Sequence, residues 1–254
     1  MVNGTLYSSK YNYAGLYCTK CGCSSLKHLF IELHKNELSE TDKNNVSTDT
    51  AKKIFGIKLG DSSINPDTFK IFVLIRNPYL RAISMYINKY IGENSHIKKS
   101  MKSKDITNKH GESFTSFLLF LKELKNKNLL NKVDGHVYEQ SYDMDVPIDK
   151  ITVIKLENFE EEMKQFYSKN FGDKPNLVNK VNKLFTDSKI LHSNRTKINP
   201  EINNVIENVP AFKFTEKNNI PTYDTFYNKE TKKLVEEIYA DDFKLFGYKK
   251  ELPF

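Results

Sequence analysis

The chain has 254 residues, a formal net charge of +7, 39% hydrophobic residues and 12% aromatic residues. This aromatic content argues against a disordered chain, and the sequence has neither an apolar run long enough to span a membrane nor the apolar core of a signal peptide. The positive charge favours an anionic partner such as a nucleotide or an acidic glycan, although charged runs are usually solvated surface. We expect one soluble, cytoplasmic α/β domain over residues 1–254, with a polar insertion at about 92–112.

The predicted elements alternate between strands and helices after a short lead-in over residues 1–12. Segments with apolar, β-branched runs are predicted as strands, at the start of 13–30 and at 54–59, 70–76 and 151–156. Segments with apolar residues at helical spacing are predicted as helices, ending near His34, beginning near Pro78 and Phe114, and covering 159–171, 178–184 and 229–248. Residues 187–228 are expected to be irregular because prolines interrupt them. This order predicts a parallel sheet with helices on its faces.

The stretch YAGLYCTKCGCSSLKHLF, residues 13–30, is a candidate anion site. It is predicted as a strand, a tight turn and a helix, with Ser24 and Ser25 where N-cap residues belong. The first turn of a helix has unbonded N–H groups and a dipole that favours negative charge, and Lys20 adds a full positive charge there. We therefore expect this turn to bind a phosphate.

A second candidate phosphate site follows the strand at 70–76, in IRNPYLRAISMY. Arg76 ends the strand and Ser84 lies in the next helix, so a guanidinium fork and a hydroxyl could converge on one phosphate. Arg81 is either a third contact or a solvated side chain. Taken alone, the Arg-Asn-Pro turn indicates only a strand-to-helix cap. In a parallel sheet, Lys20, Arg76 and the loop after residue 156 are expected at the same edge, where ligands bind.

Two other kinds of site must be considered for the turn around Lys20. A triphosphate loop of the Walker type has the order GxxxxGK[ST] and needs magnesium ligands, whereas Lys20 here precedes Gly22 and no acidic strand end is evident. A zinc site would use the side chains that share metal-ligand spacing, namely Cys18, Cys21, Cys23 and His28. No second Cys/His pair completes that zinc site, and three neighbouring cysteines do not suggest a secreted disulfide framework.

The two phosphate motifs, taken together, resemble those of sulfotransferases that use 3′-phosphoadenosine 5′-phosphosulfate (PAPS). KCGCSSL resembles the PKxGTTSL-like loop that holds the 5′-phosphosulfate, and IRNPYLRAISMY resembles the RDPxxRxxSxY-like segment that holds the 3′-phosphate. Thr19 stands where that family usually has proline, Asn77 where Asp is common, and Cys23 where a hydroxyl residue is frequent.

Three later stretches are similar to the Golgi carbohydrate sulfotransferases, the sulfotransferase 2 family. DGHVYEQSYDM resembles their His-x-x-x-Gln segment, KITVIKLENFEEEM their strand-then-Glu segment, and VEEIYADDFKLFGY their C-terminal Tyr-x-x-Asp-Phe-x-x-Phe-Gly-Tyr pattern. The resemblance extends from about Leu16 to Tyr248, but it consists of short segments separated by stretches without similarity. It implies the sulfotransferase fold, a P-loop-like parallel sheet flanked by helices, with PAPS as co-substrate and a carbohydrate hydroxyl as acceptor.

The resemblance also implies which residues bind the donor. The 5′ side of PAPS would be held by the loop residues Lys20, Cys21, Gly22, Cys23, Ser24 and Ser25. Arg76 and Ser84 would hold the 3′-phosphate, and the late basic loop with Arg195 and Lys197 would cover the nucleotide.

The chemistry implied is in-line attack of a hydroxyl on sulfur, which needs leaving-group stabilisation and a base. Lys20 would stabilise the leaving phosphate, and His136 is the first candidate for the base, with Glu139 and Glu157 as alternatives. No metal is required. The competing hypotheses are a P-loop-type nucleotide-dependent kinase and a non-catalytic basic glycan-binding protein on the same fold. No nucleic-acid-binding signature is present, and the sequence leaves the oligomeric state open.

Overall fold

A computed structural model describes residues 4–39, 48–57, 65–92, 95–142, 146–187, 198–204, 206, 208–215 and 219–254. The chain forms two compact units. The sheet unit comprises Val2–Arg76 and Asp143–Ser193, and the helical unit comprises Asn77–Tyr142 and Asn194–Phe254. Among the described residues, no helix combines the length and the apolar character needed to cross a membrane.

The sheet unit is built on five strands in the order β3-β1-β2-β4-β5. The strands are β1 (Gly4–Ser8), β2 (Tyr13–Tyr17), β3 (Gly56–Ile57), β4 (Lys70–Ile75) and β5 (Ile151–Lys155). β2, β4 and β5 are parallel neighbours, whereas β1 is antiparallel to both β2 and β3. The α/β class is therefore confirmed, and the sheet is parallel over three of its strands only.

The lead-in predicted for residues 1–12 is wrong, because Gly4–Ser8 form the strand β1. β1 pairs with β2 from Gly4 opposite Tyr17 to Ser8 opposite Tyr13. A turn of a few residues can connect antiparallel strands but not parallel ones, so the short link before Tyr13 dictates this pairing. Asn12 takes a left-handed backbone conformation in that link, with φ 53°.

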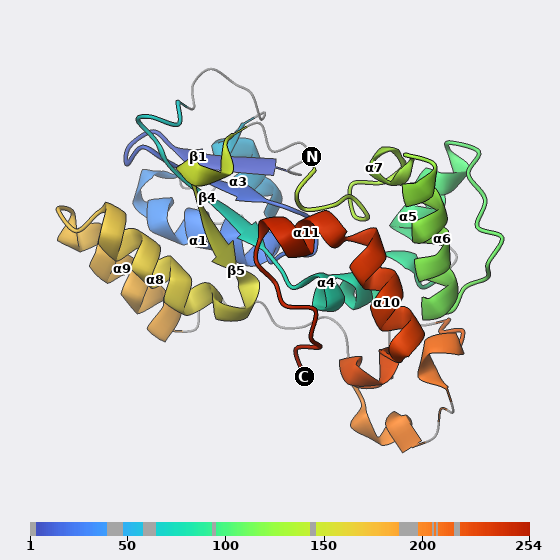
Figure 1. The fold of residues 1–254 in the computed structure, drawn as a ribbon. Helices are drawn as coiled ribbons and strands as arrows, with labels where there is room; N and C mark the ends of the chain where they lie inside the picture. The colour runs from blue at the N-terminus through green and yellow to red at the C-terminus, as the bar shows by residue number, and fades with distance from the viewer. Residues whose placement is uncertain are drawn as a thin grey trace. The chain divides into compact units, whose positions relative to one another are not determined.

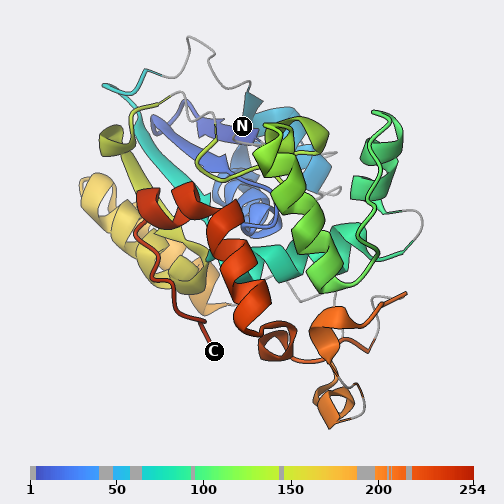
Figure 2. The ribbon, with the colours of Figure 1, turned by 45° about the vertical axis from the view of Figure 1, so that its right-hand side comes forward.

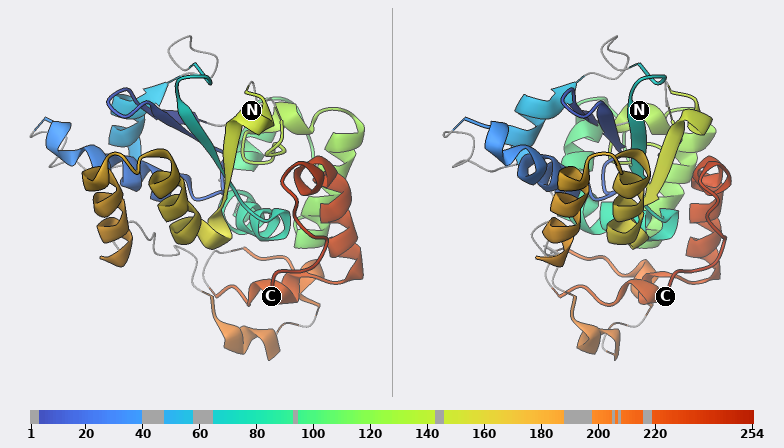
Figure 3. Two further views of the ribbon diagram at one scale, coloured as in Figure 1. Left: turned by 60° about the vertical axis from the view of Figure 1, so that its left-hand side comes forward. Right: turned by 90° about the vertical axis from the view of Figure 1, so that its left-hand side faces the viewer.

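The helices of the sheet unit pack on one another and on the sheet. They are α1 (Cys23–His34), α3 (Thr48–Phe55), α8 (Phe159–Asn170) and α9 (Pro175–Thr186), with short 3-10 turns at Lys35–Glu37, Ile148–Lys150 and Leu156–Asn158. Figures 1 and 3 show α8 and α9 side by side. Phe72 and Leu74 of β4 join side chains of all four helices in one buried cluster. Their alternation along β4 follows the two-residue period of a strand.

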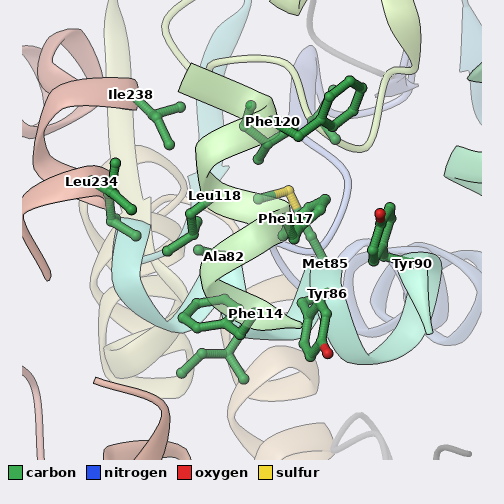
Figure 4. Packing of buried hydrophobic residues seen from close by; sticks show 14 of the residues in the cluster. Ala82, Met85, Tyr86, Tyr90, Phe114, Phe117, Leu118, Phe120, Leu234 and Ile238 are labelled. Carbon is green, nitrogen blue, oxygen red and sulfur yellow. The ribbon is translucent and has the colours of Figure 1, made fainter. Parts of the chain in front are cut away.

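The helical unit contains α4 (Pro78–Met85), a π-helical turn (Tyr86–Tyr90), α5 (His96–Lys102), α6 (Phe114–Asn126), α7 (Leu130–Val133), α10 (Lys229–Ile238) and α11 (Ala240–Leu245). Short 3-10 turns lie at Pro200–Asn204, Val209–Ala211 and Tyr223–Phe226. α6 and α10 lie side by side (Figure 2). Their facing side chains meet those of α4 and the π-helical turn in an aromatic-rich core, where Phe117 lies 4.7 Å from Tyr90 between ring centroids (Figure 4).

Two features of the helical unit differ from the sequence-based expectation. The single helix predicted over 229–248 is wrong, because Tyr239 has φ −111° and ψ 33° and separates α10 from α11. The polar region at 92–112 contains the helix α5, whose Ser95 side chain caps it by accepting a hydrogen bond from the Lys98 N–H. A capped two-turn helix with buried Ile97 and Met101 therefore lies inside the region predicted as an insertion.

Candidate functional site

The predicted phosphate turn has the expected strand, turn and helix. β2 ends at Tyr17, and the N–H of Cys21 donates to the Cys18 carbonyl at 3.3 Å, which closes the turn. Lys20 has φ 66° and Gly22 has φ 80°, so the chain passes through two left-handed conformations within three residues. Such a reversal turns successive backbone N–H groups toward one side, which is the geometry of anion-binding loops.

Helix α1 begins at Cys23, with Gly22 as its N-cap. The prediction that Ser24 or Ser25 is the N-cap is therefore wrong: both lie in the first helical turn, and Ser25 is buried. No acidic side chain lies in that turn, and no side chain caps it. A glycine in the left-handed region can close the turn without a side-chain cap, so the helix N-terminus keeps its affinity for an anion.

Gly22 has a backbone conformation that strains other residues, and a Cβ added there would also meet neighbouring side chains. A Cβ built on it would lie 2.5 Å from Cδ1 of Leu156 and 3.3 Å from Cδ2 of Leu74. Leu156 directly follows β5, so the turn after β2 packs against the segment after β5.

Arg76 connects the two phosphate motifs. Its Nη1 donates a hydrogen bond to the carbonyl of Lys20 at 3.3 Å, across 56 residues of sequence. The parallel register explains the encounter, since Tyr17 at the end of β2 is opposite Leu74 of β4, and Ile75 is opposite Lys155 of β5. Lys20 and Arg76 thus both follow parallel strands at the carboxyl edge of the sheet.

Asn77 begins the helical unit and acts as a helix cap. Its Oδ1 accepts a hydrogen bond from the Tyr79 N–H at 2.9 Å, and Pro78 occupies the first helical position. Asn and Asp serve this capping function about equally well, so the replacement of the family's usual Asp leaves the turn intact. Ser84 lies in the same helix and is buried, with 5% of its surface exposed.

Arg81 is buried, so its interpretation as a solvated side chain is wrong. Only 1% of its surface is exposed, and its Nη2 donates to the backbone carbonyl of His136 at 3.4 Å. Its guanidinium also lies over the ring of Tyr239, 5.7 Å from the centroid. A buried guanidinium must be well partnered, and Arg81 therefore ties α4 to the segment that carries His136.

His136 is paired with Asp134, a residue that the sequence analysis missed. The Asp134 Oδ1 accepts from both the His136 backbone N–H, at 2.8 Å, and the His136 Nδ1, at 2.6 Å. Burial opposes ionisation of Asp134, but these hydrogen bonds outweigh it and lower the pKa of the carboxyl below its ordinary value. An ionised carboxylate can only accept, so it holds the proton of the neutral imidazole on Nδ1 and leaves the Nε2 lone pair available.

The His-x-x-x-Gln segment is held by the C-terminal helices. The Asp242 carboxylate is fully buried and accepts from Gln140 N–H at 3.0 Å, Gln140 Nε2 at 3.3 Å, Ser141 N–H at 2.8 Å and Ser141 Oγ at 2.8 Å. The Tyr239 hydroxyl donates to the Val137 carbonyl at 3.1 Å. The C-terminal segment with Tyr239 and Asp242 therefore holds the segment of His136, about a hundred residues earlier in the chain, and we call these contacts the C-terminal clamp.

The two alternative bases occupy different environments. Glu139 is buried and accepts from Lys125 and from Asn131 Nδ2, which makes it a structural ion pair. Burial raises its pKa, and Lys125 only partly offsets this. Glu157 lies in the 3-10 turn after β5 and is exposed.

The remaining predicted residues are distributed as follows. Arg195 and Lys197 lie outside the described residues. Cys18 and Cys21 are buried and Cys23 is half-buried, and none of the three forms a disulfide. Within the described ranges, the metal-ligating side chains that come together in a group of three are His96, Asp134 and His136, and not the cysteines with His28.

A comparison with protein families identifies the chain. The model of the sulfotransferase family matches residues 3–249. The chain belongs to the sulfotransferase family. No curated protein and no solved structure matches it significantly. Membership supports sulfuryl transfer in general and agrees with the α/β sheet flanked by helices, so the resemblance drawn from the separated motifs is confirmed.

Replacing Gly22 by Ala tests the anion-binding turn. We expect it to lower the free energy of unfolding by more than the roughly 1–2 kcal/mol of a left-handed alanine, because the new Cβ must also displace the Leu156 side chain. Gly247→Ala is the matched control, since Gly247 has φ +63° but nothing within 4 Å of the added Cβ. Urea denaturation measures both. Equal losses in the two variants would mean that Leu156 places no constraint on the turn.

Replacing Asp242 by Asn tests the C-terminal clamp. The amide nitrogen would face a buried donor, so we expect a loss of about 1–3 kcal/mol in the free energy of unfolding. Asp241→Asn is the control, because the Asp241 side chain is 70% exposed and should change the stability by less than about 0.5 kcal/mol. Thermal or urea unfolding of the two variants measures the difference in their stability. A clamp that contributes nothing would leave Asp242→Asn as stable as Asp241→Asn.

Proposed function

We propose that this protein is a PAPS-dependent sulfotransferase that moves the sulfuryl group to a hydroxyl of a carbohydrate. The observation that carries the proposal is the hydrogen bond from Arg76 to the Lys20 carbonyl. It brings a lysine-bearing turn and an arginine together at one sheet edge, and a donor with phosphates at both the 5′ and the 3′ position needs two neighbouring cationic sites.

The turn after β2 is proposed to hold the 5′-phosphosulfate. The groups that would bind it are the backbone and side chains of Lys20, Cys21, Gly22, Cys23, Ser24 and Ser25. Two left-handed residues, an uncapped helix N-terminus and the absence of acid in the first turn of α1 support this assignment. Cys23 offers a weaker donor than the hydroxyl that is frequent at this position in the family, so backbone N–H groups would carry more of the binding.

The 3′-phosphate is proposed to bind Arg76 and Ser84. A guanidinium can form a bidentate contact with a phosphate, and Arg76 lies beside the turn that carries Lys20. The assignment of Ser84 rests on the family motif. Arg195 and Lys197 remain proposed contacts to the nucleotide on the same ground.

The reaction proposed is a single displacement at sulfur. A new bond forms between the acceptor oxygen and sulfur, and the bond between sulfur and the bridging oxygen of the 5′-phosphate breaks. The electron pair leaves with that oxygen, whose negative charge Lys20 and the helix dipole stabilise. The hydroxyl proton passes to Nε2 of His136, and Asp134 stabilises the imidazolium that results.

The carbohydrate acceptor rests on the resemblance of the His-x-x-x-Gln and C-terminal segments. Sulfuryl transfer is preferred over phosphoryl transfer because the family match covers residues 3–249 and the lysine precedes the glycine in the anion-binding turn. The proposed displacement requires no metal. A cytoplasmic location stays a prediction from the sequence.

Nucleotide binding provides the first test of this function. We expect 3′-phosphoadenosine 5′-phosphate to stabilise the protein by about 2.7 kcal/mol at roughly 100 times its Kd, and adenosine 5′-phosphate to do so far less. Thermal unfolding over a concentration series measures both effects. In Arg76→Lys the preference for the 3′-phosphate should shrink, because the bidentate fork is lost. Equal stabilisation of the wild type by both nucleotides would contradict the role of Arg76 and Ser84.

Sulfuryl transfer by substituted enzymes provides the second test. Lys20→Ala should lower kcat about 10²–10³-fold, because the variant lacks the positive charge that stabilises the leaving phosphate. His136→Ala should lower it about 10²–10⁴-fold because the base is lost. Lys35→Ala, at the far end of α1, and His110→Ala, at an exposed pair with Glu123, are the controls and should keep full activity. Undiminished transfer by Lys20→Ala would exclude the mechanism.

A further inference from the structure

Two histidines and one carboxylate cluster in the helical unit. His96, Asp134 and His136 each offer a ligand atom, and these atoms lie within 4.8 Å of one another. The two imidazole rings are 5.4 Å apart between centroids. The sulfuryl transfer proposed above uses Asp134 and His136 but leaves His96 without a function.

The cluster is held by three separate hydrogen-bonding arrangements. His96 is the first residue of α5, and α5 is fastened to the end of α7 because Ser100 Oγ donates to the Val133 carbonyl at 2.6 Å. Asp134 directly follows Val133, and its Oδ1 fixes the His136 backbone. Arg81 binds the His136 carbonyl from α4. Ser100 and Arg81 thus position from outside the cluster the backbone that carries these side chains, and Asp134 fixes His136 from within it.

The donor chemistry selects the kind of ion. Two imidazoles and one carboxylate suit divalent first-row transition ions such as Zn²⁺, whereas Mg²⁺ and Ca²⁺ prefer oxygen ligands. His96 is exposed and provides an entry path, while Asp134 and His136 are half-buried. Lys89 and Lys99 act on His96 through their positive charge, so coordination bonds and not the local field would supply the affinity.

We propose that His96, Asp134 and His136 form an inhibitory site for a divalent transition-metal ion such as Zn²⁺. The Nδ1 of His136 and the Oδ1 of Asp134, 2.6 Å apart, become neighbouring ligands, and the ion takes the place of the proton between them. That proton moves through solvent to Nε2, so the imidazole stays neutral. Its Nε2 then carries a proton and can no longer accept one from a substrate hydroxyl. The inhibition rests on the proposed function, whereas the binding of the ion does not.

Cobalt absorbance tests the binding without any activity assay. The full-length protein titrated with Co²⁺ is expected to develop visible d–d bands that saturate at one equivalent, and Zn²⁺ but not Mg²⁺ should abolish them. His96→Ala should lose the bands. His110→Ala should keep them, because His110 forms only a two-residue pair with Glu123, at 2.9 Å. A spectrum unchanged by His96→Ala, or a thiolate charge-transfer band from the cysteines, would overturn the site.

Inhibition by Zn²⁺ tests the consequence for catalysis. The wild type should be inhibited by Zn²⁺, and His96→Ala should need at least about tenfold more Zn²⁺ for the same inhibition while keeping its basal kcat. Equal sensitivity of the two enzymes would overturn the inhibitory role. If the chain transfers no sulfuryl group at all, the proposed function fails, and the cobalt titration still decides whether the ion binds.

Discussion

The hydrogen bond from Arg76 to the Lys20 carbonyl is the contact on which the candidate site depends. It exists because β2 and β4 are parallel neighbours that end at the same edge, and because Lys20 and Gly22 bend the chain back through left-handed conformations. Another residue at Gly22 would be strained at φ 80°, and its Cβ would require the Leu156 side chain to shift. The sheet register, the glycine and the arginine therefore act as one constraint on the anion-binding turn.

A second constraint operates in the helical unit, where buried polar groups fix the segment of His136. Asp242 satisfies four donors on Gln140 and Ser141, and Tyr239 binds the Val137 carbonyl. Tyr239 can do so because the helix breaks at this residue, which separates α10 from α11. The break that the helical periodicity did not predict is thus the feature that directs the tyrosine hydroxyl and the buried carboxylate toward the loop.

Much of the sheet unit follows from local pattern, and what was missed depends on contacts distant in sequence. The apolar run of β4 and the periodicity of α1 were sufficient to predict both elements and to bring Arg76 near Lys20. β1 was missed because five residues with mixed polarity become a strand only by pairing with β2 and β3. Asp134 lies two residues before His136, and that spacing was visible, but nothing local distinguishes an acidic turn residue from a hydrogen-bond partner of the imidazole.

The pairing of Asp134 with His136 has consequences of opposite sign for catalysis. An ionised carboxylate on Nδ1 sets the tautomer that a base needs, and the low pKa of Asp134 keeps that partner charged. The same two atoms can become neighbouring metal ligands when the ion replaces the proton on Nδ1, since Nδ1 and Oδ1 already face each other across one hydrogen bond. A histidine oriented in this way can bind a transition-metal ion where a third ligand lies close, and His96 lies close here. In the proposed mechanism, sensitivity to zinc would then follow from the orientation of the base and would not be an independent addition to it.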